Sequence, residues 1–183
     1  MNVLPSIFIL ATAYVIVFVE ATFSGVRHLI GVQLDLLPSL MVYASLSRGL
    51  PTITALAICG GLWFDSISSN PIGVSILPLF VTGLVIQRYK GLILRSETFA
   101  QRLLGFFASI AVPVLTLVIV LNTDRKPLLG WFLIWQLVLL GLAGAILTPL
   151  WFTIFDRLSN ALNYRPHEQT TFRPDRQIKR GRK

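Results

Sequence analysis

Charge is missing from long runs of this sequence, and that absence limits what the chain can fold into. The charge-free stretches are residues 1–19, 36–47, 49–64, 66–87, 103–123 and 127–155. A helix that crosses the hydrocarbon core of a bilayer needs about 20 apolar residues, with a range of about 17–25. Four of the six stretches have that length or nearly so, which predicts a polytopic all-α membrane protein.

The two shorter stretches, 36–47 and 49–64, are separated only by Arg48. Gly49 and Pro51 follow it and are typical helix breakers. A single continuous helix would bury Arg48 at a cost of roughly 2.5–3.5 kcal/mol or more. We therefore expect two short helices in a hairpin, and about six spans in all.

Composition agrees with a membrane protein. Charged residues make up 13% of the chain, against about 25% in soluble domains, and the mean hydropathy is +0.72. We expect one transmembrane domain over residues 1–156 and a polar, basic tail over 157–183, which has too little apolar content to form a core. The expected spans are about 4–23, 31–47, 50–64, 71–89, 103–121 and 128–155.

The basic residues predict the orientation. With six spans, thirteen of the sixteen Lys and Arg residues fall on the side of the two termini. Cytoplasmic loops carry the excess of Lys and Arg, so both termini are expected in the cytoplasm. The N-terminus lacks the basic start of a cleaved signal, and the single cysteine, Cys59, excludes an intramolecular disulfide.

Small residues recur inside the expected spans. Ala57 with Gly61, and Gly141 with Ala145, have the spacing that lets membrane helices approach closely. We interpret these positions as helix-packing residues, since Gly is common in transmembrane helices generally.

The segment GGLWFDSISSNPIGVSILPLF, residues 60–80, places Asp65 between two apolar runs. Asn70 and Pro71 have the chemistry of a helix start, because Asn caps free amides and Pro fits the first helical position. Asp65 could then cap local amides. The alternative is a polar cluster at the mouth of a cavity that binds a ligand or a partner, since acidic residues at membranes mark candidate functional sites.

Catalysis is not indicated. His28 and His167 are the only histidines, and neither makes a sensible dyad with a serine of the 65–71 loop. No spacing suits a metal site, and no glycine-rich phosphate loop precedes a helix. The isolated acids Glu20, Asp35 and Asp65 all fall near the expected outer face. We predict a non-enzymatic protein without cofactor or metal.

The pattern Gly61-x3-Asp65-x7-Gly73 resembles the central signature of the rod shape-determining MreD family. Ile67, Ser68, Pro71 and Gly73 fall in register with that signature, while Ser66 replaces an aliphatic residue and Ser69 the usual glycine. The segment DLLPSLMVYASLSRGLP, which contains Asp35 and Pro38, looks like the proline-led second span of the family. The specific resemblance covers about residues 31 to 90.

The resemblance implies an inner-membrane component of the bacterial cell-elongation machinery, which organises peptidoglycan synthesis and rod shape. It implies direct binding of MreC, and contact through it with the filament protein MreB and with the glycosyltransferase and transpeptidase. It also implies a fold like the six-helix S components of energy-coupling-factor transporters. The residues expected to shape the partner-binding outer face are Gly61, Asp65, Ser68, Asn70, Pro71, Gly73, Asp35 and Pro38.

Two further expectations concern the tail and a rival function. Lys179, Arg180, Arg182 and Lys183 can lie on anionic lipid, whereas nucleic-acid binding is not expected. The rival function is a substrate-binding component of a vitamin-type transporter. Its solute pocket would draw on Trp63, Asp65, Asn70, Trp131 and Trp135.

Overall fold

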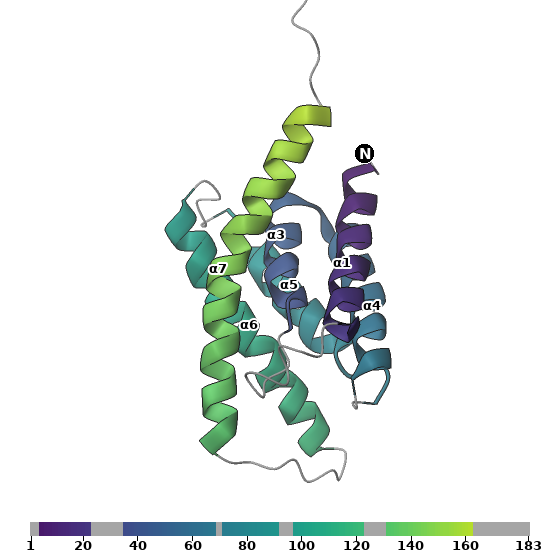
Figure 1. Ribbon diagram of the computed structural model, residues 1–183, viewed down its shortest axis with the longest axis vertical. Coiled ribbons are helices and arrows are strands. Elements are labelled where there is room, and N and C mark those ends of the chain that lie inside the picture. The colour runs from purple at the N-terminus through teal and green to yellow at the C-terminus, as the bar shows by residue number, and fades with distance from the viewer. Residues whose placement is uncertain (1–3, 23–34, 69–70, 92–96, 123–130, 163–183) are drawn as a thin grey trace, which may run out of the picture.

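The computed structural model describes residues 4–22, 35–68, 71–91, 97–122 and 131–162 of the chain. Within these residues the fold is all-α, with six helices and no strand (Figure 1). They are α1 (Leu4–Thr22), α3 (Leu37–Ser47), α4 (Leu50–Ile67), α5 (Ile76–Tyr89), α6 (Thr98–Leu121) and α7 (Trp131–Leu162).

Three helices are long and apolar enough to cross a membrane: α4, α6 and α7. The other three are shorter apolar helices. The helix bounds differ from the expected spans at three places. Helix α4 continues past Asp65 and α5 begins only at Ile76, and α6 begins at Thr98 rather than near residue 103. Helix α7 continues to Leu162, so residues 157–162, which were expected in the polar tail, are helical. The expected span at 31–47 is also shorter in its described part, where α3 has 11 residues, or about 16 Å of length.

Helix α3 lies at the centre of the bundle. It contacts each of the other five described helices, and its residues Leu37–Leu46 are all buried. A helix that is apolar on every side is typical of such a position. The longer helices surround it, with α1 and α4 on one side and α6 and α7 on the other (Figure 1).

The directions of the helices follow from their contacts. Ser6 bonds to Thr52, and the ring of Tyr14 packs on Trp63, so α1 and α4 run parallel. Trp151 bonds to Ser39, and Phe155 stacks on Tyr43, so α3 and α7 also run parallel. The start of α1 and the end of α7 therefore lie at the same end of the bundle (Figure 1).

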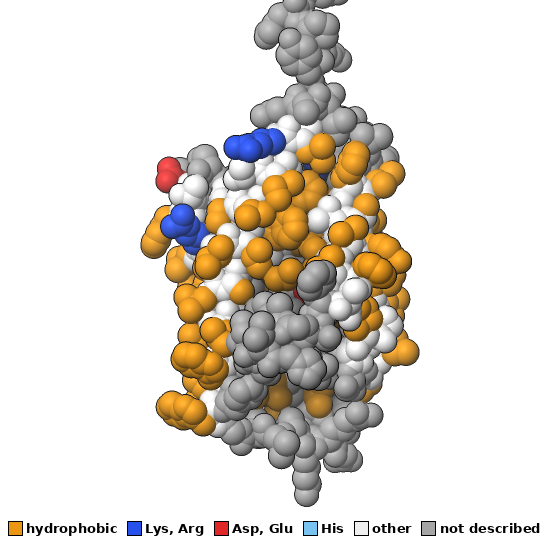
Figure 2. Space-filling model, in the orientation of Figure 1, with side chains coloured by type: hydrophobic (Ala, Val, Ile, Leu, Met, Phe, Trp, Pro, Cys, Tyr) orange, Lys and Arg blue, Asp and Glu red, His pale blue; other side chains and the backbone are white. Residues whose placement is uncertain are grey.

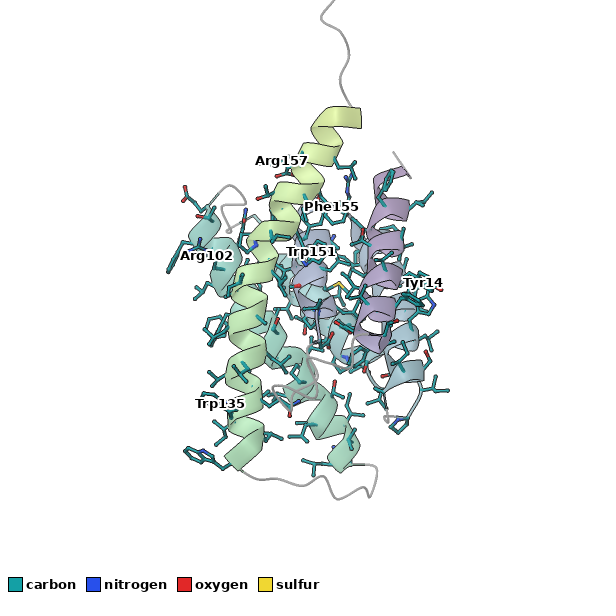
Figure 3. The ribbon with its side chains drawn as sticks, in the orientation of Figure 1. Tyr14, Arg102, Trp135, Trp151, Phe155 and Arg157 are labelled. Carbon is teal, nitrogen blue, oxygen red and sulfur yellow. The ribbon has the colours of Figure 1, made fainter. Side chains whose placement is uncertain are left out.

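Charge is segregated along the bundle axis. The Lys and Arg side chains visible in Figure 2 lie toward the end where α7 finishes, and most of the remaining described surface of that view is hydrophobic. Arg102 and Arg157 lie toward this end, and Trp135 lies toward the opposite one (Figure 3). We call the first the basic end and the second the Trp131 end. A chain with this apolar surface is a membrane protein with several candidate spans.

Candidate functional site

The Asp65 carboxylate closes the loop between α4 and α5. Asp65 lies in the last turn of α4 and is only 2% exposed. Its Oδ2 accepts hydrogen bonds from the backbone N–H of Gly73 at 2.8 Å and of Ser75 at 3.1 Å, and its Oδ1 accepts one from the Ser75 hydroxyl. We call this arrangement, Asp65 with Gly73 and Ser75, the clasp.

Two glycines make the clasp possible. Gly73 has a φ of 95°, which residues with a side chain rarely adopt. A Cβ on Gly61 would lie 3.0 Å from the Cα and backbone N of Ile76. Gly61 thus lets the start of α5 approach α4, and Gly73 lets the loop turn back toward Asp65.

The expected helix start at Asn70-Pro71 is wrong. Residues 72–75 form a turn, closed by a hydrogen bond from the Val74 N–H to the Pro71 carbonyl at 3.3 Å, and α5 begins after Ser75. Asp65 accepts hydrogen bonds from the amides of Gly73 and Ser75, which lie just before α5, and the side chain of the N-cap residue Ser75 does not cap the helix. Asn70 lies outside the described residues, and Ser68 ends α4 as its C-cap.

Two further carboxylates accept hydrogen bonds at the start of α3. Glu20, in the last turn of α1, accepts a hydrogen bond from the Leu36 N–H at 2.8 Å, and Asp35 accepts one from the Leu37 N–H at 3.0 Å. Pro38 follows in the first turn, where its missing N–H leaves no donor unpaired. The two acids therefore cap the central helix α3. Asp35 lies directly before the helix, and Glu20 lies on α1.

The sequence places Glu20, Asp35 and Asp65 near one expected face but does not show which backbone groups each acid binds. Glu20 and Asp35 accept from adjacent backbone amides at the start of α3, whereas Asp65 accepts from the loop before α5. The second oxygen of Glu20, Oε2, is buried and has no hydrogen-bond partner among the described residues. A carboxylate removed from water is costly, and the backbone donors at the helix start offset part of that cost.

The depth of this region also differs from expectation. Ser39 in the first turns of α3 accepts a hydrogen bond from the Trp151 indole at 3.0 Å, which places the start of α3 level with Trp151. Helices α6 and α7 extend farther toward the Trp131 end than α1 and α4 do (Figure 1). Glu20 and Asp35 therefore lie recessed beside the α6–α7 hairpin rather than at the end of the bundle.

The predicted packing residues have different roles. Ala57, Gly61 and Gly141 are buried, and a Cβ on Gly141 would lie 2.7 Å from the Phe106 ring. Ala145 is only partly buried. The closest approach of α6 and α7 instead uses Gly105 and Gly144, where a Cβ on either residue would collide with the other's backbone carbonyl. The spacing of Gly141, Gly144 and Thr148 was the available signal.

The described residues contain no group of three His, Cys, Asp or Glu side chains that could hold a metal ion. The basic tail residues Lys179, Arg180, Arg182 and Lys183 lie outside the described part of the chain. What the geometry offers chemically is a set of hydrogen-bond acceptors that fix a loop and a helix start.

Comparison with known proteins gives no family assignment. No protein-family model, no curated protein and no solved structure matches the chain.

Proposed function

We propose that the chain is a non-enzymatic scaffold of the bacterial inner membrane, of the rod shape-determining MreD type, that binds MreC in the cell-elongation complex. The clasp is the observation that carries this proposal. The three residues of the signature that the sequence resembles, Gly61, Asp65 and Gly73, have separate physical tasks in one loop. A signature that fixes the shape of a loop suits a surface that a partner protein recognises.

The clasp presents an apolar side chain. Ile72, between Pro71 and Gly73, is 75% exposed although the loop around it is held by hydrogen bonds. An ordered apolar side chain loses little entropy when a partner covers it. In this proposal the extracytoplasmic segment of MreC contacts Ile72, and both termini of the chain lie in the cytoplasm.

The small residues inside the described helices limit where a partner helix can lie. Gly61 packs on Ile76, Gly141 on Phe106, and Gly144 on Ser109, so these positions are filled by the chain itself. A groove of these small residues is therefore not free for a partner. A transmembrane helix of MreC would contact exposed larger side chains instead, and MreB, the glycosyltransferase and the transpeptidase would join through MreC.

The rival transporter component receives no specific support. A solute pocket needs polar groups that are free to meet a solute. Trp63 packs edge-on against Tyr14, with ring centroids 5.2 Å apart, and Asp65 accepts three hydrogen bonds from its own loop. Two of the side chains that could have lined such a pocket thus have internal contacts.

Co-purification of the chain with tagged MreC tests the proposal. Ile72→Ser removes the exposed apolar contact and leaves the clasp intact, so we expect less bound MreC with unchanged melting. Asp65→Asn removes the charge and one acceptor, which weakens the clasp by about 1.5–3 kcal/mol per charged hydrogen bond lost. We expect it to lower both melting temperature and MreC binding.

Matched control variants distinguish an effect of the clasp loop on MreC binding from a general effect of the same exchange elsewhere on the surface. Ile7→Ser makes the same exchange at another exposed position, near the basic end, and Glu97→Gln converts an exposed carboxylate to an amide. Both should bind MreC as the wild type does. Wild-type binding by Ile72→Ser and Asp65→Asn would remove the loop from the interface, and no binding by the wild type would reject the function.

A further inference from the structure

The turn between α3 and α4 contains two polar atoms that are buried without a partner. The Ser47 hydroxyl oxygen and the Arg48 Nε have no hydrogen-bond partner among the described residues. Arg48 and Gly49 are both extended, with φ and ψ of −125° and 177° and of −91° and 172°. An unpaired buried donor costs about 1–3 kcal/mol, and more for a charged group. Both residues are partly exposed, so an acceptor from outside the chain can reach the turn.

The chemistry of the turn specifies that acceptor. A guanidinium can only donate hydrogen bonds, and a serine hydroxyl can donate one. Helix α4 begins directly after the turn, with Gly49 as its N-cap and without a side-chain cap, so its dipole adds positive potential. The guanidinium, the serine hydroxyl and the dipole of α4 all favour an anionic ligand. The planar guanidinium of Arg matches the oxygens of a phosphate group well.

The position of the turn along the bundle agrees with a headgroup ligand. The Tyr43 ring stacks on Phe155 at 4.7 Å, and Arg48 follows five residues later, about 7.5 Å farther toward the basic end. Along α7, Trp131 and Arg157 are separated by about 39 Å. A bilayer with its headgroup regions is about 40–45 Å thick, so the bundle from Trp131 to the α3–α4 turn has the length that would bring Arg48 to the lipid phosphates.

We propose that Ser47 and Arg48 form a binding site for a phosphate group at the α3–α4 turn. Arg48 donates from its guanidinium and Ser47 from its hydroxyl to the phosphate oxygens. The phosphate can be that of an anionic phospholipid or a free phosphate, and one experiment distinguishes these two sources. The site does not depend on the partner proposed above.

The experiment measures melting of the full chain in nanodiscs, together with the phospholipid retained after detergent extraction. Wild type is compared in phosphatidylcholine with and without phosphatidylglycerol, and in phosphatidylcholine with inorganic phosphate. Arg48→Gln should lose most of the stabilisation and retain about fivefold less lipid, as expected for about 1 kcal/mol per basic residue near a membrane surface. Arg88→Gln removes the same charge from an exposed position in the last turn of α5 and should behave as wild type.

Stabilisation by phosphatidylglycerol alone assigns the site to a lipid headgroup, and stabilisation by inorganic phosphate assigns it to a free anion. Equal losses in Arg48→Gln and Arg88→Gln would overturn the proposal, because they indicate diffuse attraction only, as would a wild type that responds to neither addition. If Arg48→Gln does not accumulate, Ser47→Ala keeps the charge and removes one donor. Wild-type lipid retention by Ser47→Ala would then overturn the site.

Discussion

At the scale of single residues, carboxylates in this chain serve as helix and loop caps. Asp65 accepts three hydrogen bonds from Gly73 and Ser75 in the loop before α5, and Glu20 and Asp35 each accept one at the start of α3. Backbone donors must be paired wherever water is scarce. A buried acid is tolerated at Asp65 because the same donors that need an acceptor stabilise its charge.

Gly73→Ala tests the clasp without touching its carboxylate. The φ of 95° costs a residue with a side chain about 1–2 kcal/mol. For a chain of this size each kcal/mol lowers the melting temperature by about 2–4 °C. Thermal melting in detergent should show this loss for Gly73→Ala. Gly91→Ala should melt as wild type, because a Cβ there would have no atom within 4 Å, and equal melting of the two variants would contradict the role of Gly73.

At the scale of elements, the contact of α6 and α7 depends on two glycines. A Cβ on Gly144 would collide with the Ser109 side chain, and a Cβ on Gly105 with the Thr148 side chain. Backbones this close gain packing along their whole contact length, which is the main attraction between helices in lipid. Pro113 and Pro149 lie inside the same helices, and each removes one backbone donor from the helical hydrogen bonds.

Gly144→Ala should separate α6 from α7. Overpacking of this kind costs about 1–3 kcal/mol, and we expect lower melting and earlier proteolysis in the hairpin. Gly60→Ala provides the comparison, because its Cβ would meet only the ends of the Leu37 and Leu56 side chains, at 3.4 Å and 3.8 Å. It should be neutral or stabilise α4 by up to about 1 kcal/mol. A neutral Gly144→Ala would show that the two backbones are farther apart.

At the scale of the whole molecule, a short buried helix is enclosed by longer ones. Helix α3 has 11 residues and contacts every other described helix. Its start is level with Trp151 on α7, and its end reaches the basic end. The start of α1 and the end of α7 share that end (Figure 1).

Cysteine labelling in intact cells tests the orientation. In a Cys59→Ala background, Arg157→Cys and Arg102→Cys should be protected from an impermeant maleimide, because cytoplasmic segments carry the excess of basic residues. Ile72→Cys, at an exposed position on the clasp loop, should react. The reverse pattern would invert the topology, and reaction at both ends would reject a single orientation.

The sequence by itself determined the class of the protein and the approximate location of its helices. Charge-free runs of span length allow only apolar helices in a membrane, because each backbone group must be paired within its own segment. Arg48, Gly49 and Pro51 likewise separated α3 from α4, and the two helices are distinct. These features are local, and a local pattern is sufficient to predict them.

Only the tertiary structure shows which residues distant in sequence bind or contact one another. Asp65 is bound by residues eight and ten positions later, and Leu36 by an acid sixteen positions earlier. The Asn70-Pro71 pattern predicted a helix start at Pro71, but α5 begins at Ile76, and the distant Asp65 carboxylate binds the N-cap residue Ser75. Gly144 rather than Ala145 makes the close contact with α6, because the rotation of one helix against another is set by packing. Contacts of this kind depend on the relative position of whole helices, which no short sequence pattern specifies.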